Sequence, residues 1–228
     1  PDAKTIWKFK NDLAETKTVN TLFCMFDEYL EKEGLISHKG TIVDAPRQRN
    51  SRDENKKIKN GEIPEEWEKP ENKSKLAQKD IDADWTKKNG ERHFGYKNHV
   101  KCDADSKLIT NYSVTSASVH DSQRCLVFIG QEDEVLYADS AYSGKPIALA
   151  LPENCKNQIC EKGYRNSPLT SEQKMNNRRK SRIRCRIEHI FGFMTGAMHG
   201  ITRAWMNIGI TNLVYNLCRY SYLKRTSA

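Results

Sequence analysis

Val135-Leu136-Tyr137-Ala138-Asp139 is a short apolar run that ends in a carboxylate and precedes the turn-forming Ser140. Thr41-Ile42-Val43-Asp44-Ala45 has the same form, and Pro46 stops it. Runs this short that are rich in β-branched and aromatic residues predict strands. Each strand carries an aspartate at its C-terminal end. A divalent cation can hold a carboxylate at the rim of a sheet, because it offsets the cost of removing that charge from water.

The segments around these two runs alternate between strand and helix patterns. We predict a hairpin of strands at 93–103 and 108–115, a helix capped by Asp121 or Ser122 and ended by Gly130, a short helix at 146–151, and a further strand at 157–160. An antiparallel pair followed by this alternation predicts a mixed α/β sheet with helices on its faces. Functional groups of such sheets gather at the C-terminal ends of neighbouring strands, where Asp44 and Asp139 lie.

The chain divides by composition. Residues 4–33 have the spacing of two short helices, so we assign residues 1–36 to the remnant of an N-terminal helical region and residues 37–228 to the main domain. A polar and flexible insertion is expected at about 47–90. Its alternating acids Asp80, Asp82 and Asp84 could hold a cation, but an exposed acidic loop is favoured because a metal site needs converging ligands.

A strongly basic helix is predicted near the C-terminal end. Six of the nine residues from Arg178 to Arg186 are basic. One apolar sector of this helix contains Ile183, Ile187, Ile190, Phe191 and Met194. Glu188 lies beside that sector, one turn after Arg184. The two residues form either a local ion pair or a metal ligand with its positioning residue, and the two strand-end aspartates favour the second interpretation.

The last apolar residues of the chain also have helical spacing. Ile210, Leu213, Val214, Leu217 and Tyr220 follow one another at intervals typical of a helix, and they are expected in the core.

Charge indicates the class of partner. The 228 residues include 38 Lys and Arg against 30 Asp and Glu, a net charge of +8, which favours a polyanion. Three converging carboxylates can hold two Mg²⁺ or Mn²⁺ ions about 3.5–4 Å apart, which is an arrangement suited to phosphodiester chemistry. Nearby arginines would neutralise DNA phosphates. The predicted DNA-binding residues are Arg178, Arg179, Arg182, Arg184 and Arg186.

No apolar run approaches the roughly 18–20 residues that a membrane span requires, and no signal peptide is recognisable. We therefore expect a cytoplasmic, nucleoid-associated protein without a membrane partner. Seven scattered cysteines lack the paired spacing of a zinc site and are expected to be reduced and mostly buried.

Several sequence islands, taken together, resemble the DDE transposases of the bacterial insertion-sequence five family. In order, they are Pro1-Asp2-Ala3-Lys4-Thr5-Ile6-Trp7-Lys8-Phe9, Gly40-Thr41-Ile42-Val43-Asp44-Ala45, Gly95-Tyr96-Lys97-Asn98-His99-Val100, Ser118-Val119-His120-Asp121-Ser122, Tyr137-Ala138-Asp139-Ser140-Ala141-Tyr142-Ser143-Gly144, and Arg184 with Glu188, Phe191 and Gly192. They extend from Pro1 to about Arg219, and their order makes the resemblance specific.

The resemblance implies a ribonuclease H-like core in which Asp44, Asp139 and Glu188 bind the catalytic metal ions. Enzymes of this family cut DNA strands at the ends of a mobile element and join the freed 3′-hydroxyls to target DNA, and we expect a homo-oligomer assembled on DNA. Family members carry an upstream helical region, which we expect to be missing from this sequence. The chain also has Ser181 where the family has a tyrosine, and Thr195 where it has a basic residue.

Three functions remain open from the sequence. An active transposase core is favoured by the three acidic residues. A catalytically weak or inactive DNA-binding remnant is compatible with Ser181 and Thr195. A glycoside hydrolase with paired carboxylates is disfavoured by the basic helix, since a neutral sugar gains little from many cations.

Overall fold

The computed structural model describes residues 1–45, 63, 65, 69–72, 74, 80–88, 91–192 and 200–226. Most of the insertion predicted at 47–90 lies outside these residues, as do Met194 and Thr195.

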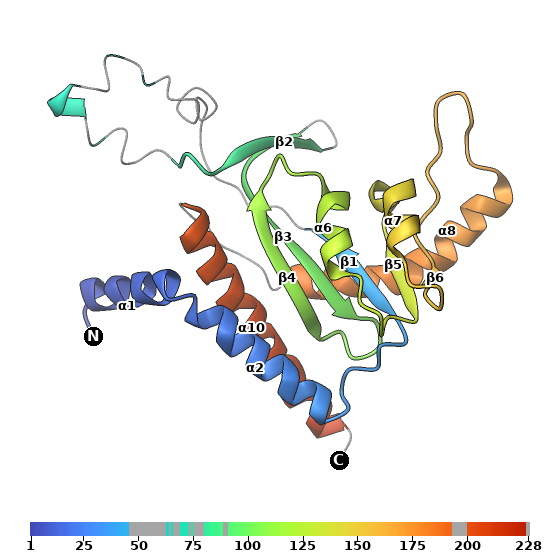
Figure 1. Ribbon diagram of the computed structural model, residues 1–228, viewed down its shortest axis with the longest axis horizontal. Coiled ribbons are helices and arrows are strands. Elements are labelled where there is room, and N and C mark those ends of the chain that lie inside the picture. Colours follow the sequence, from blue (N-terminus) through green and yellow to red (C-terminus); the bar gives the residue numbers. More distant parts are fainter. Residues whose placement is uncertain are drawn as a thin grey trace.

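The described strands form one mixed sheet (Figure 1). They are β1 (Thr41–Asp44), β2 (Asp84–Lys88), β3 (Glu91–Asp103), β4 (Ile109–Ser116), β5 (Val135–Ala138) and β6 (Lys156–Asn157). The order is β2-β3-β1-β5-β6, with β4 paired to β3. Strand β3 is antiparallel to its neighbours, whereas β5 is parallel to both β1 and β6. The α/β, ribonuclease H-like sheet is thereby confirmed, including the predicted β3–β4 hairpin. Strand β2 was not predicted, because its residues close the polar insertion.

Helices cover both faces of the sheet. They are α1 (Ala3–Glu15), α2 (Thr18–Lys32), α6 (Asp121–Phe128), α7 (Lys145–Ala150), α8 (Ser171–Arg184), α9 (Glu188–Phe191) and α10 (Ile201–Thr226), with 3₁₀ turns η1 (Pro70–Asn72), η2 (Ser140–Tyr142) and η3 (Cys185–Ile187). The two N-terminal helices are confirmed. The cap of α6 is His120 rather than Asp121 or Ser122, because its imidazole accepts a hydrogen bond from the Ser122 amide at 3.3 Å.

Each face of the sheet is covered by an apolar core. On one face, α2 and α10 lie side by side and pack Phe23 and Ile208 against Ile42 of β1 (Figure 1). On the other face, α6 and α7 pack Phe128 and Ile147 against Val43. Adjacent residues of β1 therefore belong to different cores, as expected from the alternation of side chains along a strand.

The predicted core face of helix α10 is confirmed only in part, since Ile210, Leu213 and Tyr220 are partly buried against the apolar clusters. Val214 and Leu217 are 40% and 45% exposed, so their assignment to the core is wrong. Asn212 and Asn216 are buried in their place. Asn216 accepts from the Ile109 amide at 2.9 Å and donates to the Ile109 carbonyl at 2.7 Å. These hydrogen bonds satisfy polar groups at the sheet, which is why a polar face turns inward.

The acidic group at Asp80 and Asp82 holds the N-terminal end of α10. Asp80 accepts from the Gly200 amide at 2.8 Å, and Asp82 accepts from the Ile201 amide at 3.2 Å. The predicted exposed loop is therefore wrong for Asp80, which is 8% exposed and also accepts from the Tyr96 hydroxyl. Negative charge at this position satisfies the first amides of the helix and favours its dipole.

Candidate active site at the ends of two parallel strands

Asp44 and Asp139 lie at the same edge of the sheet. The parallel register of β1 and β5 pairs Val43 with Ala138, so the next residue in each chain direction is an aspartate. Ile42 and Tyr137 pack in the α10-side core, and side chains alternate along a strand. Both aspartates consequently point to this same face. Neighbouring strands lie about 4.8 Å apart, which places the two carboxylates within reach of a shared cation.

Local turns orient both carboxylates. Asp44 Oδ1 accepts from the Ala45 amide at 2.8 Å. Asp139 begins η2, and its Oδ1 accepts from the Ala141 amide at 2.8 Å and from the Ser140 hydroxyl at 3.1 Å. Each aspartate lies at the end of a strand, where the following backbone amides lack partners in the sheet ladder and are available to the carboxylate.

The segment bearing Glu188 covers the face to which these aspartates point. Ile187 and Ile190 are fully buried in the α10-side core, whereas Glu188 is exposed. Arg184, one turn earlier, donates from Nη1 to Asp44 Oδ2 at 2.8 Å. The structure thus pairs Arg184 with Asp44 and not with Glu188, so the local ion pair considered from the sequence is not formed. The contact brings the Glu188 segment to the end of β1.

The three carboxylates do not form a closed single-ion cage. Their oxygens do not all lie within 4.8 Å of one another. A single Mg²⁺ would require separations of at most about 4.2 Å, because each oxygen lies about 2.1 Å from the ion. Two ions about 3.5–4 Å apart have a looser requirement, since different acids can bind different ions. Asp44, Asp139 and Glu188 all offer carboxylate oxygens, which are the hard donors that Mg²⁺ and Mn²⁺ prefer.

The comparison with known families gives a direct result. The Transposase DDE domain family matches residues 38–217. The chain belongs to the DDE transposases. The matched segment contains both strand-end aspartates, the basic helix and Glu188. No solved structure matches the chain. Membership of this family implies DNA as substrate and the use of divalent metal ions.

A basic groove runs along α8 in this transposase domain. It has a volume of about 580 Å³ and is lined by Leu169, Lys174, Asn177, Arg178, Ser181, Arg182 and Cys185. Lys174, Arg178 and Arg182 follow one another at four-residue spacing and so share one face of the helix. Lys174 was absent from the predicted DNA-binding set, although its spacing before Arg178 was a usable signal. We call Lys174, Arg178 and Arg182 the α8 cationic row.

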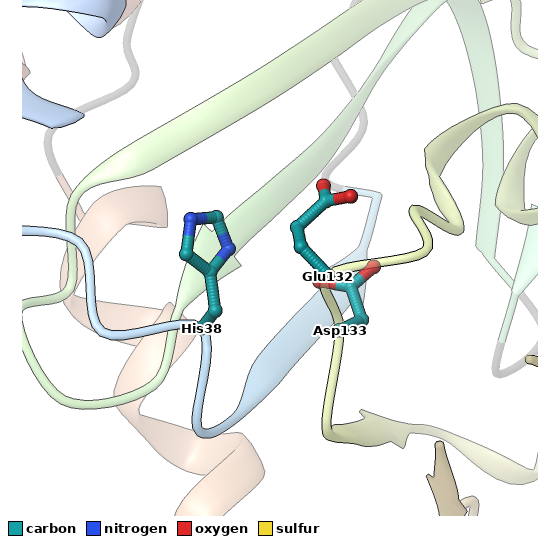
Figure 2. A group of neighbouring side chains, drawn as sticks. All are labelled: His38, Glu132 and Asp133. Carbon is teal, nitrogen blue, oxygen red and sulfur yellow. The ribbon is translucent and has the colours of Figure 1, made fainter. Parts of the chain in front are cut away.

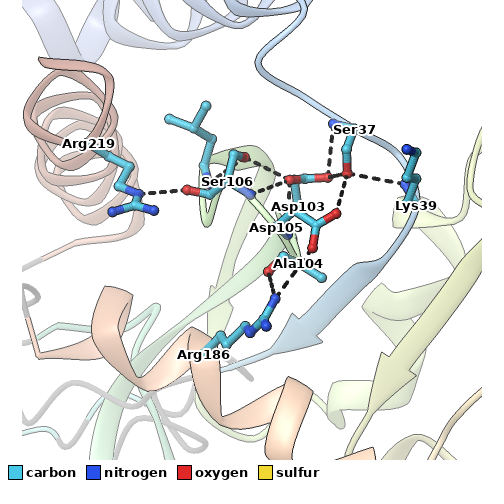
Figure 3. A network of polar contacts seen from close by, with 9 residues as sticks. Ser37, Lys39, Asp103, Ala104, Asp105, Ser106, Arg186 and Arg219 are labelled. Atoms are coloured by element: carbon cyan, nitrogen blue, oxygen red, sulfur yellow. Dashed lines mark hydrogen bonds and ion pairs between the residues drawn. The ribbon is translucent and has the colours of Figure 1, made fainter. Parts of the chain in front are cut away.

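The other predicted arginines of the transposase domain have different surroundings. Arg179 lines a separate recess with Gln158 and Asn176. Arg186 donates to the Ala104 carbonyl at 2.7 Å and approaches Asp105 at 3.4 Å (Figure 3). Arg184 is engaged by Asp44. Within the described part of the chain, Arg184 and Arg186 therefore serve intramolecular contacts.

The turn that receives Arg186 joins several distant segments (Figure 3). Asp103, which is 2% exposed, accepts from the Ser37 hydroxyl at 2.8 Å and from the Ser106 amide at 2.7 Å. Arg219 of α10 donates to the Ser106 carbonyl at 2.6 Å. The Asp103 carboxylate organises this turn, which also anchors the η3 segment that precedes Glu188.

A second group of potential metal ligands lies just before the N-terminal ends of β1 and β5, opposite the ends that carry Asp44 and Asp139. His38, Glu132 and Asp133 bring one ligand atom each within 4.8 Å of one another (Figure 2). Asp133 is 2% exposed and already accepts from Thr41 Oγ1 at 2.6 Å and Lys101 Nζ at 3.0 Å. The buried ammonium occupies the place of a cation. We therefore assign this group to structural ion pairing in the transposase domain.

Asp27 of α2 lies near these ion pairs, and its ionised carboxylate is unfavourable there. Its Oδ1 is buried and accepts no hydrogen bond from a described residue. Burial and the neighbouring Glu31 raise the pKa of Asp27 from 3.8 to about 7, while Lys101 and His38 oppose the shift. The folded state therefore binds more protons than the unfolded state between these two values. This carboxyl makes the protein less stable as the pH rises from 3.8 towards 7.

We expect Asp27→Asn to stabilise the transposase domain at pH 8 by about 1–2 kcal/mol, after allowance for solvent screening. The gain should vanish below the ordinary carboxyl pKa, since Asp27 is then neutral in both states. Urea unfolding at several pH values measures the effect, and Asp12→Asn on the exposed surface of α1 is the control. An equal gain at every pH would show that the charge of Asp27 is not its cause.

Proposed function

We propose that this chain is an active DDE transposase core of the insertion-sequence five type, with Asp44, Asp139 and Glu188 as ligands of two Mg²⁺ or Mn²⁺ ions. The observation that carries the proposal is the parallel register that puts Asp44 and Asp139 side by side on the face covered by the Glu188 segment. The family match supports the reaction class, and the ordered sequence islands support the narrower family.

In this proposal each acid has a defined place. Asp44 neighbours Asp139 on the adjoining strand and is bonded to Arg184 of the segment that leads to Glu188, so the three carboxylates would hold the ions together. When bound, the ions activate an attacking water or 3′-hydroxyl and stabilise the leaving oxygen of the phosphodiester. Asp139 is held by its own turn, and exposed Glu188 can move toward the strand ends. The carboxylates thus provide a partly preformed site at the sheet edge.

DNA is proposed to approach over the α8 cationic row. These side chains line one groove along the helix whose C-terminal end reaches Asp44. Phosphate contacts of this kind position DNA without reading its sequence. Arg179 could extend the contact on the adjoining recess. We further propose that copies of the chain assemble on paired DNA ends and that the protein is nucleoid-associated. Among the described residues, no helix is both long and apolar enough for a membrane span.

For the domain organisation, we propose residues 37–228 as the catalytic domain and residues 1–36 as a helical extension. Phe23 of this extension packs in the α10-side core, so α2 supports the same face that carries the aspartates. The extension therefore contributes to the stability of the catalytic domain.

An inactive DNA-binding remnant is the second candidate. Ser181, at the position where the resemblance expects tyrosine, lies in the groove with its hydroxyl 3.7 Å from the Cys160 sulfur. Without an aromatic side chain at this position, one expected contact with DNA is lost, while the three carboxylates are retained.

The test is metal-dependent cleavage. Purified protein is incubated with DNA that carries the sequences flanking its own coding region, together with target DNA and either Mg²⁺ or Mn²⁺. Nicks at defined ends, or joined products, are expected only with the ions. DNA binding without any product under these conditions would favour the remnant.

A further inference from the structure

Arg184 occupies a position that the proposed site would need to give to a metal ion. Its Nη1 lies 2.8 Å from Asp44 Oδ2, and the two side chains are only 22% and 15% exposed. The pair is thus largely shielded from water. An ion pair in such surroundings is stronger than one at an exposed surface. A guanidinium at this oxygen and a divalent ion at the same oxygen would repel each other.

The charges around Asp44 make such a partner necessary. Asp44, Asp139 and Glu188 bring three negative charges to one end of the sheet. Among the described residues, neither Asp139 nor Glu188 has an ion pair, and the Arg184 guanidinium at Asp44 offsets part of the repulsion among the three acids. Other arginines of the same segment point elsewhere, as Arg186 does toward Ala104.

The backbone at Arg184 is suited to a change of contact. Helix α8 ends at Arg184, and three residues of 3₁₀ helix follow before α9 begins at Glu188. A stretch of 3₁₀ helix within a longer helix often marks a hinge. Arg184 directly precedes this 3₁₀ segment and Glu188 directly follows it. A small change in the winding of the segment would therefore withdraw Arg184 and change the position of Glu188 at the same time.

We propose that Arg184 is a built-in counter-ion of Asp44 that competes with the metal ions and sets their affinity. This inference rests on the proposed metal site. In the metal-free protein, Arg184 holds Asp44 in place and limits the repulsion among the acids. Metal binding displaces the guanidinium, which then faces solvent or a DNA phosphate. Arg184 is a positioning residue in this scheme.

The experiment measures Mn²⁺ binding to the whole chain by electron paramagnetic resonance, without DNA. Arg184→Gln should bind Mn²⁺ about tenfold more tightly than the unsubstituted protein, because a close unit charge of the same sign is removed. Arg184→Lys keeps the charge and should stay within about twofold. Arg165→Gln removes an equal charge from an exposed turn and is the matched control.

Asp44→Asn separates this inference from the proposed function. If Asp44→Asn leaves Mn²⁺ binding unchanged, the proposed metal site fails and the inference fails with it. If Asp44→Asn weakens binding but Arg184→Gln binds no more tightly than the unsubstituted protein, the metal site stands and the counter-ion role is wrong. Should Arg184→Gln not fold, as judged by circular dichroism, tenfold tighter binding by Arg184→Lys would overturn the proposal, and unchanged binding would support it.

Discussion

Asp139→Asn is expected to reduce Mg²⁺-dependent DNA cleavage by about a thousandfold or more, because loss of one metal ligand removes stabilisation of both attacking and leaving oxygens. The amide keeps the shape of the side chain and can still accept from the Ala141 amide, the contact that fixes Asp139 at 2.8 Å. Folding should therefore be preserved. DNA affinity should be retained, since the α8 cationic row is untouched.

The measurement combines a cleavage time course with fluorescence anisotropy on the same DNA. Asp12→Asn is the matched control, because Asp12 is exposed on α1, far along the chain from the strand ends. The control should cleave at the rate of the unsubstituted protein. Cleavage by Asp139→Asn at the normal rate would remove Asp139 from the proposed ligands. Loss of both DNA binding and cleavage would indicate a folding defect, which a thermal unfolding measurement would reveal.

The strand ends were predictable because their signals are local. Each aspartate directly follows an apolar run, and a residue that ends strands, Pro46 or Ser140, comes soon after it. Residues within a few positions therefore decide where each strand ends. The mixed sheet also follows from the order of these short patterns. That Asp44 and Asp139 are neighbours required one further rule, namely that parallel strands align their C-terminal ends.

The remaining features depend on distant partners. Arg184 bonds Asp44 across 140 positions, and Asp80 bonds the Gly200 amide across 120. Periodicity alone suggested a pair with Glu188 in the first case and an exposed loop in the second. The buried asparagines of α10 were missed for the same reason, since the Ile109 backbone supplies both hydrogen-bond partners of Asn216.

Simultaneous replacement of the α8 cationic row, with Lys174, Arg178 and Arg182 all changed to Gln, is expected to weaken DNA binding by about a hundredfold at moderate salt. The three side chains line one groove, so a single DNA backbone can meet all of them. Each phosphate that a cationic side chain neutralises releases counter-ions on binding. The slope of log affinity against log salt should therefore fall by about 2.7, or roughly 0.9 for each phosphate that is no longer neutralised.

A triple variant with the same decrease in net charge provides the control. Lys145, Lys156 and Arg165 are exposed and lie outside the groove, so their replacement by Gln should reduce affinity only through the long-range field of the protein. Fluorescence anisotropy across a salt series distinguishes the two variants. Equal slopes would mean that net charge, and not the α8 groove, attracts DNA. A lower slope for the groove variant alone would place the phosphate backbone beside the helix that carries Arg184 and would connect DNA binding to the carboxylates at the strand ends.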